Sequence, residues 1–109
     1  MITWSNFEKI DIRVGCITEV NDFPSAKKPA YQLTIDFGEL GIKKSSAQIT
    51  SLYKKEMLLM RQVIAIINFP VKQIGNFFSE CLVLGVYNEN NEVVLLMPDS
   101  AVKNGSKIG

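Results

Sequence analysis

The chain has 109 residues, of which 47% are hydrophobic, and its 12 Lys and Arg against 11 Asp and Glu give a formal net charge of +1. This length supports one domain, residues 1–109, with a single core. No apolar run approaches the ~20 residues of a membrane-spanning helix, and residues 1–10 lack the features of an export signal, so we expect a cytoplasmic protein without membrane insertion.

The absence of histidine excludes most common catalytic and metal centres. Ser-His-Asp and Cys-His arrangements and histidine-containing zinc sites all need it. Cys16 and Cys81 are the only cysteines and form no C-x-x-C pair, so we expect two buried, reduced thiols. The sequence therefore predicts no metal, no cofactor and no catalytic residue. Ser45 or Ser46 with Lys43 or Lys44 is the remaining enzymatic route, and for Ser45 with Lys44 it is unfavourable because adjacent strand residues point to opposite faces.

The first predicted elements are a short helix and a strand. Thr3 or Ser5 is a suitable N-cap for an amphipathic helix that carries Trp4 and Phe7. Alternating aliphatic and polar residues then predict a strand over residues 10–20, followed by a proline-containing loop.

Two further strands and a helix follow. Residues 31–37 alternate most clearly, and residues 42–48 are expected to return beside them as a hairpin, because glycines flank the connection. Thr50 is a suitable N-cap for a helix over residues 51–60, in which Tyr53, Met57 and Met60 share a face.

The last third of the chain is predicted to form strands. Val63 to Ile67 is a β-branched run typical of a buried strand, and Phe77 and Phe78 are expected in the loop that follows it. Residues 82–87 and 93–97 read as a hairpin. The pattern predicts an all-β-dominated fold: a five-stranded OB-type barrel with a short N-terminal helix, one helix between strands three and four, and a C-terminal hairpin extension.

Positive charge is concentrated in the middle of the chain. Residues 27–72 hold eight Lys or Arg against three acids, whereas the rest holds four against eight. Within this segment, Lys43 to Thr50 is a run of charged and small hydrogen-bonding residues with little to bury. The asymmetry favours an anionic partner at one face, and a solvated surface without a ligand is the alternative.

Short motifs along nearly the whole chain resemble the tRNA-binding domain family, and most closely its stand-alone branch of bacterial export-related chaperones. The motifs are Asp11 to Gly15, Lys27 to Tyr31, Ile35 to Gly38, Lys44 to Thr50, Val63 to Pro70, Gln73 to Gly75, Ser79-Glu80, Leu82 to Gly85 and Asn104-Gly105. The resemblance implies an OB barrel, binding of tRNA, affinity for unfolded or export-destined polypeptides, and a homodimer joined through terminal segments. Two positions depart from the family: Met60 stands where related chains often carry glycine, and Leu82 where the broader family tends to carry methionine.

Polar residues in and around the basic segment are the candidate tRNA contacts. Lysines suit phosphates as point donors, and exposed amides, hydroxyls and carboxylates suit the edges of unpaired nucleotides. The lysines are Lys27, Lys28, Lys43, Lys44 and Lys72, and the other candidates are Ser46, Gln48, Asn68, Gln73, Ser79 and Glu80. The alternatives are a solvated lysine surface, hydroxyls and amides that satisfy loop backbone, and an ion pair between Glu80 and a lysine. For Arg13, a salt bridge with Asp11 competes with tRNA contact.

Apolar residues outside the predicted strands supply two further hypotheses. Phe23, Phe77, Phe78 and Met97 lie in or beside loops, where they could stack on bases or hold an apolar peptide, although Phe77 or Phe78 is expected to reach the core. Ile2, Trp4 and Phe7 are too apolar to be left exposed on a monomer, so we expect them on the barrel or in a dimer interface.

Two functions therefore stay open. The first is a non-catalytic, homodimeric tRNA-binding protein with chaperone activity toward unfolded or export-destined polypeptides. The alternative is a protein-only chaperone for apolar or basic peptide segments, in which the basic face does not bind RNA. Salt dependence separates them, because only RNA binding weakens steeply as salt rises.

Overall fold

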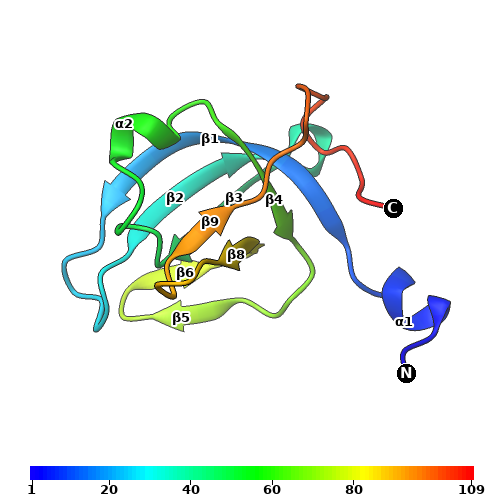
Figure 1. Ribbon diagram of the computed structural model, residues 1–109, viewed down its shortest axis with the longest axis horizontal. Helices are drawn as coiled ribbons and strands as arrows, with labels where there is room; N and C mark the ends of the chain where they lie inside the picture. The colour runs from blue at the N-terminus through cyan, green and yellow to red at the C-terminus, as the bar shows by residue number, and fades with distance from the viewer.

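A five-stranded, nearly closed barrel sheet forms the centre of the computed structural model, which describes residues 1–109 (Figure 1). The strand order is β3-β2-β1-β4-β7. These strands are β1 (Ile12–Asp22), β2 (Tyr31–Asp36), β3 (Ile42–Ala47), β4 (Gln62–Ile66) and β7 (Leu82–Val83). The other elements are α1 (Trp4–Glu8), η1 (Gly38–Leu40), α2 (Lys55–Leu58), β5 (Lys72–Ile74), β6 (Phe77–Ser79), β8 (Gly85–Tyr87) and β9 (Val93–Leu95). The predicted OB-type fold is confirmed. None of the helices has the length and apolar character needed to cross a membrane.

The long strand β1 is shared between the two halves of the barrel. It pairs antiparallel with β4 over Ile12–Cys16 and with β2 over Cys16–Asp22. The register against β2 shifts between Ile17 and Glu19, and a bulge of this kind bends a strand and increases its twist. β1 consequently arches over the barrel in Figure 1.

A glycine on β1 makes room for the largest core side chains. A Cβ atom at Gly15 would stand 2.6 Å from Cγ2 of Ile35 and 2.7 Å from the ring of Phe37. Gly15 and Ile17 therefore belong to the face of β1 that enters the barrel, and Ile12, Val14 and Cys16 belong to the opposite face. Cys16 and Cys81 are buried free thiols, as predicted. The buried cluster comprises Ile17, Leu33, Ile35, Phe37, Ala47, Ile49, Tyr53, Leu58, Val63, Ala65, Cys81 and Leu95.

The N-terminal helix is confirmed, and the internal helix is shorter than predicted. Thr3 is the N-cap of α1 and accepts a hydrogen bond from the Asn6 N–H at 3.2 Å. A helix lies between β3 and β4 as predicted, but α2 spans only Lys55–Leu58, within the predicted residues 51–60, and its N-cap is Lys54 instead of Thr50. Tyr53 precedes α2 and is held elsewhere: its carbonyl accepts from the Tyr31 hydroxyl at 2.8 Å, and its own hydroxyl accepts from the Leu95 N–H at 2.9 Å.

The segment after β4 contains a hairpin where we expected a loop. Phe77 and Phe78 lie in β6, which pairs with β5 through Ile74↔Phe77 and Gln73↔Phe78. Gly75 turns this hairpin with a φ of 61°. The C-terminal hairpin is confirmed as β8–β9, with Val86 opposite Val94.

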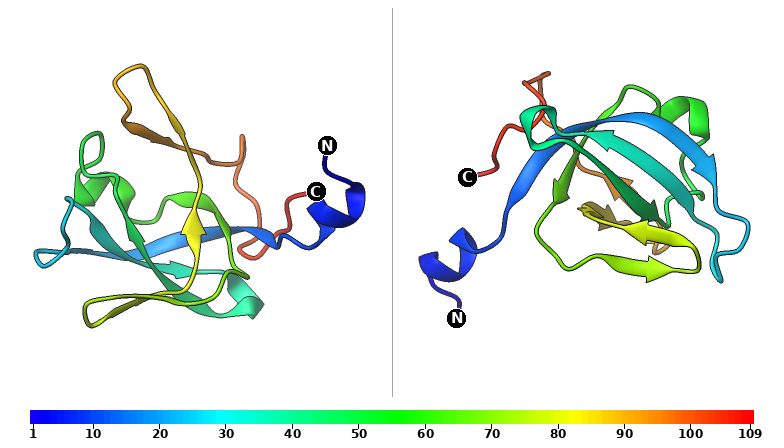
Figure 2. Two further views of the ribbon diagram at one scale, coloured as in Figure 1. Left: turned by 90° about the horizontal axis from the view of Figure 1, so that it is seen from below. Right: turned by 180° about the vertical axis from the view of Figure 1, so that it is seen from behind.

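The tail extends the sheet beside β1. The Gly105 N–H donates to the Val14 carbonyl at 2.7 Å, the Val14 N–H to Ser106 at 2.9 Å, and the Ile108 N–H to Ile12 at 2.9 Å. Figure 2 places both termini on the same side of the barrel.

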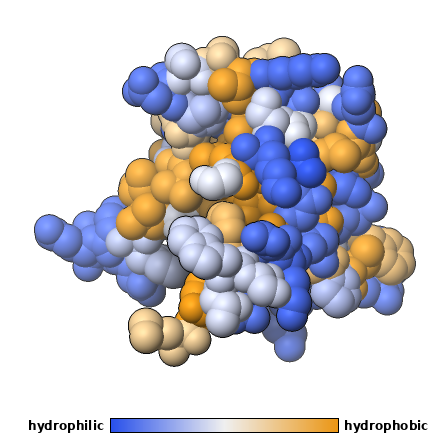
Figure 3. Space-filling model, turned by 90° about the vertical axis from the view of Figure 1, so that its right-hand side faces the viewer, coloured by the Kyte–Doolittle hydropathy of each residue, from blue (hydrophilic) through white to orange (hydrophobic).

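The outer side of the sheet carries an apolar surface, which we call the outer face. Its residues point away from the core because their strand neighbours Val63, Ala65 and Leu95 are buried. Val86 and Val94 are 54% and 41% exposed. Figure 3, viewed from the side of α1, shows apolar side chains gathered in the middle with hydrophilic ones around them. The outer face comprises Ile64, Ile66, Leu84, Val86, Val94 and Leu96.

Met60 adopts a left-handed backbone conformation, which glycine accepts more readily than other residues. Its φ is 64°, its N–H donates to the Ile17 carbonyl at 2.7 Å, and its side chain is 72% exposed. A Cβ atom makes this conformation costly by roughly 1 kcal/mol or more. The hydrogen bond to β1 therefore holds a strained residue at the end of α2.

Met60→Gly is expected to raise the free energy of unfolding by about 0.5–1 kcal/mol, because it relieves this strain and removes little packing. Met57→Gly is the matched control, since Met57 is 51% exposed but lies inside α2. There glycine is expected to lower stability by about 1 kcal/mol. Urea unfolding measures both, and an equal loss at the two positions would contradict the strain at Met60.

Candidate nucleic-acid interface

A groove of about 890 Å³ lies beside the barrel, with residues of both β5–β6 and β8–β9 among its lining. The left view of Figure 2 shows these two hairpins projecting to opposite sides. The volume lies within the range of ordinary ligand sites. Five predicted tRNA contacts line the groove: Lys28, Ser46, Gln48, Lys72 and Ser79.

One wall of the groove, the lysine wall, is formed by the β1–β2 loop and the β5–β6 hairpin. Lys28 comes from the loop and Lys72 from β5. The two segments are fastened together where Phe23 of the loop packs on Phe77 of β6, with ring centroids 5.4 Å apart at a tilt of 56°. Tilted aromatic pairs of this kind stabilise contacts between elements. The positions of the two lysines are therefore set by a shared apolar contact.

The lysines of this wall have no carboxylate to neutralise them. The ion pairs of the structure are Arg13–Asp11 at 2.6 Å, Lys55–Asp22 at 2.8 Å and Lys103–Glu39 at 3.9 Å. Lys28 and Lys72 are exposed and take part in none of them. Two uncompensated ammonium groups on one wall attract an anion such as a phosphate.

The opposite wall, the hairpin wall, is formed by the β8–β9 hairpin and has a different character. Tyr87, Asn91, Glu92 and Val93 line it. The Glu92 carboxylate accepts from the Asn88 side-chain amide at 3.0 Å, and the Glu92 N–H donates to Oδ1 of the same asparagine at 2.9 Å. This wall therefore combines an exposed aromatic ring with an oriented negative charge.

Some polar side chains of the central segment hold the fold together, and others are free to bind a ligand. The Ser79 hydroxyl accepts from the Ser46 N–H at 3.1 Å and so joins the end of β6 to β3. The Ser46 hydroxyl and the Gln48 amide make no hydrogen bond within the protein and line the groove. Ser46 and Gln48 therefore keep their capacity to bind a ligand.

Glu80 contacts the backbone of β3 and makes no ion pair, so the predicted pairing with a lysine is wrong. Its carboxylate accepts from the Lys44 N–H at 2.9 Å, and its own N–H donates to the Lys44 carbonyl at 2.7 Å. These bonds bring the segment before β7 against β3 and help to close the barrel.

Several other predicted contacts lie outside the groove. Lys43 and Lys44 are neighbours on β3 and point to opposite faces, so they do not form one binding surface. Lys27 and Gln73 are exposed next to groove residues, and the Gln73 amide donates to the Gly75 carbonyl at 3.0 Å. None of the four lines the groove.

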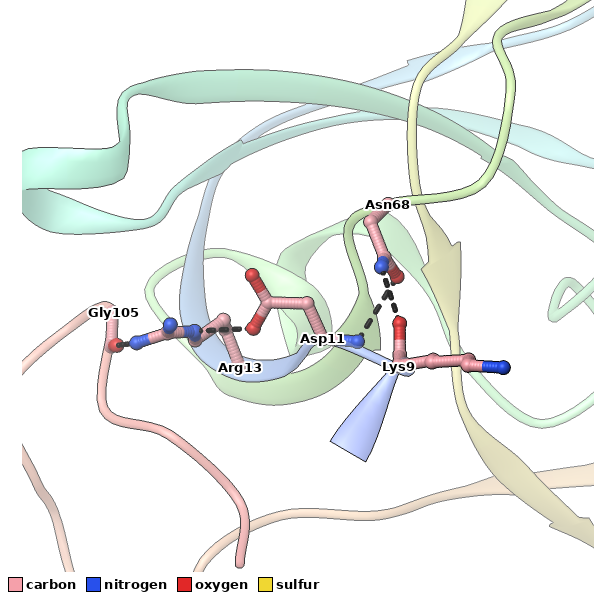
Figure 4. Close-up of polar contacts among 5 residues, drawn as sticks. All are labelled: Lys9, Asp11, Arg13, Asn68 and Gly105. Atoms are coloured by element: carbon pink, nitrogen blue, oxygen red, sulfur yellow. Dashed lines mark hydrogen bonds and ion pairs between the residues drawn. The ribbon is translucent and has the colours of Figure 1, made fainter. Parts of the chain in front are cut away.

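Asn68 joins the N-terminal segment to the end of β4, so a structural role accounts for this side chain without a ligand. Its Oδ1 accepts from the Asp11 N–H at 3.0 Å, and its Nδ2 donates to the Lys9 carbonyl at 2.7 Å (Figure 4). Beside it, the predicted Arg13–Asp11 salt bridge is present, and Nη1 of Arg13 donates to the Gly105 carbonyl at 3.1 Å. Both side chains hold the terminal segments on the barrel.

The aromatic residues of the groove differ from those predicted. Phe23 is buried against Phe77, and neither lines the groove. Phe78 is 53% exposed and Met97 54% exposed, but both lie outside the groove, and the sulfur of Met97 contacts Nη2 of Arg61 at 3.8 Å. The rings that do line the groove are those of Phe69, which is 53% exposed, and Tyr87, which is 70% exposed.

The sequence pattern does not single out Phe69 and Tyr87 as ligand contacts, because each stands at the end of a predicted strand. A signal was present: each is a large aromatic residue next to a chain reversal, before Pro70 and before Asn88. Aromatic residues at such places are often exposed, because the strand that would bury them has ended.

The cysteine in the groove lining is not a nucleophile. Burial raises the pKa of the Cys81 thiol to about 11, and the Glu80 charge adds to the rise against an opposing effect of a Ser45 hydrogen bond. The thiol is therefore neutral at physiological pH. Ser45 is 1% exposed, and its hydroxyl donates to the Cys81 carbonyl at 3.0 Å.

Comparison with known proteins places the chain in a family of nucleic-acid-binding modules. Residues 12–107 match the family described as "Putative tRNA binding domain", and the chain belongs to this tRNA-binding domain family. The resemblance to its CsaA branch is also confirmed. The CsaA chaperone protein of Picrophilus torridus is 55% identical, with a TM-score of 0.94 and 100% coverage of both chains. Chaperone CsaA of Bacillus anthracis is 47% identical, with a TM-score of 0.94 over 100% of this chain and 99% of that one.

The curated relatives are much longer proteins. Methionine–tRNA ligase of Pyrococcus abyssi is 36% identical over 107 residues, which are 98% of this chain but 14% of the ligase. The ligase of Bacteroides fragilis is 34% identical over 98% of this chain and 16% of its own length. The match therefore covers a small part of each enzyme.

Asn68→Ala is expected to lower the free energy of unfolding by about 1 kcal/mol, because it removes two exposed hydrogen bonds that join the N-terminal segment to the end of β4. Asn76→Ala is the control, since Asn76 is exposed and makes no hydrogen bond through its side chain. Urea unfolding measures stability, and a tRNA titration of the folded variant measures affinity. Unchanged stability with lost tRNA affinity would assign Asn68 to the ligand and not to the fold.

Proposed function

We propose that the chain is a non-catalytic tRNA-binding protein of the cytoplasm that acts as a homodimer and also holds unfolded or export-destined polypeptides. The observation that carries the tRNA proposal is the groove, where Lys28 and Lys72 lack carboxylate partners and the polar groups of Ser46 and Gln48 lack partners within the protein. Membership of the tRNA-binding domain family supports it.

Polypeptide binding is a second activity, supported by the apolar part of the groove. Pro29, Ile49, Leu52, Phe69 and Ile74 are among the residues that line it. An extended apolar segment gains free energy by burying side chains against such a surface. The structural similarity to proteins named as CsaA chaperones favours the same function.

A homodimer would cover apolar surface that is otherwise exposed. On α1 and the residue before its cap, Trp4 is 83% exposed and Ile2 is 77% exposed, whereas Phe7 is half-buried. The outer face lies on the same protein, and large exposed apolar surfaces mark interaction sites. We propose that the outer face, together with the terminal segments of the 109-residue unit, meets a second copy across a two-fold axis.

The tRNA proposal is tested by a titration at several salt concentrations. Lys28→Gln with Lys72→Gln is expected to weaken tRNA binding and to reduce the slope of log K against log salt by about 1–2, because each lost phosphate contact releases about one counterion fewer. Lys44→Gln with Lys54→Gln is the matched control, since both lysines are exposed, take part in no ion pair, and lie outside the groove and the terminal segments. An equal effect of both pairs would contradict a groove-specific site.

The dimer proposal is tested by the mass in solution. Val86→Asp with Val94→Asp is expected to give a monomer, because two opposed carboxylates would have to be desolvated in the interface. Phe78→Asp is the control on the other hairpin, where it should leave the dimer intact. Sedimentation equilibrium measures the mass, and a persistent dimer in the double variant would exclude the outer face as the interface.

A further inference from the structure

The two walls of the groove differ in chemistry in a way that matches one strand of RNA. The lysine wall carries Lys28 and Lys72, and the hairpin wall carries Tyr87 and Glu92. A single nucleic-acid strand has phosphates along one edge and bases along the other. Phosphates are attracted to the lysines and repelled by the carboxylate, so the strand has one favourable orientation across the groove.

Aromatic rings are available where the bases would lie. Tyr87 is 70% exposed on the hairpin wall, and Phe69 is 53% exposed in the segment that leads from β4 to β5. The Tyr87 hydroxyl makes no hydrogen bond within the protein, and its ring packs on no other aromatic ring of the structure. Exposed rings beside a basic surface bind unpaired bases by stacking on their faces.

A duplex does not fit this pattern. Its bases are paired and stacked inside, and it presents phosphates on both of its strands. The hairpin wall would then meet phosphates with Glu92, whose carboxylate is held by Asn88 at 3.0 Å. The aromatic rings would also find no base face to stack on.

We propose that the groove takes an unpaired RNA segment, with its phosphates on the lysine wall and its bases on Tyr87 and Phe69. This inference rests on the proposed function and names the part of an RNA that enters the site. The groove thereby selects loops, bulges or single-stranded ends over helical stems.

The test compares a labelled single-stranded oligoribonucleotide with the same strand annealed to its complement, at fixed salt. The single strand is expected to bind at least tenfold more tightly. Tyr87→Ala and Phe69→Ala are each expected to weaken its binding about 5- to 100-fold, the usual range for loss of one base stack. Their salt slopes are expected to stay unchanged, because the phosphate contacts remain.

Phe78→Ala is the matched control, since Phe78 has the same 53% exposure as Phe69 but lies outside the groove. Tyr87→Phe is expected to retain binding, because stacking needs the ring and not the hydroxyl. Equal affinity for single strand and duplex, or equal losses in Tyr87→Ala and Phe78→Ala, would overturn the inference while leaving RNA binding in place.

Failure of the proposed function itself would look different. No RNA of either form would then bind, even at low salt, and the inference would fall with it. Binding of an unfolded polypeptide that depends on Tyr87, with no RNA bound, would overturn the inference by making the groove a peptide site.

Discussion

The rest of the structure depends on β1, because this one strand pairs with both halves of the barrel sheet. Cys16 of β1 stands opposite Asp36 of β2 and Gln62 of β4, so the two halves of the barrel meet along a single backbone. The bulge after Ile17 bends that strand, and Gly15 leaves the space that Ile35 and Phe37 fill. Without the bend and the missing side chain, the sheet could not curl around these residues.

Closure of the barrel also builds the groove. Glu80 and Ser79 bond to the edge of β3, and this draws the β5–β6 hairpin across the open side of the sheet. The contact between Phe23 and Phe77 then fixes the β1–β2 loop to that hairpin. Leu95 anchors the β8–β9 hairpin, because its side chain is buried in the core and its N–H donates to the Tyr53 hydroxyl. The residues that carry the proposed function are therefore held by bonds that belong to the fold.

The sequence predicted the strands better than the site. Alternation identifies β2, a β-branched run identifies β4, and the glycines that flank the connection identify β3 as the partner of β2; all three are local properties of the sequence. The helix predicted over residues 51–60 begins only at Lys55, because Tyr53 is held by Tyr31 and Leu95, which are distant in sequence. The distribution of charge along the sequence identifies the candidate lysines. Lys43 and Lys44 are neighbours in β3, however, so their side chains point to opposite faces of the sheet. The bonds of Asn68 to Lys9 and Asp11 join residues almost sixty positions apart, so no local pattern reveals them. Phe69 and Tyr87 meet in one groove only after the hairpins fold.

The most direct test of the central claim, that the groove between the two hairpins holds RNA, is photo-crosslinking of tRNA that contains 4-thiouridine, followed by mass spectrometry of the attached peptides. Because 4-thiouridine reacts through the base, the account predicts crosslinks at Phe69 and within residues 87–93, where the bases would lie. Crosslinks confined to α1, the outer face or the Lys43–Lys44 end of β3 would contradict it.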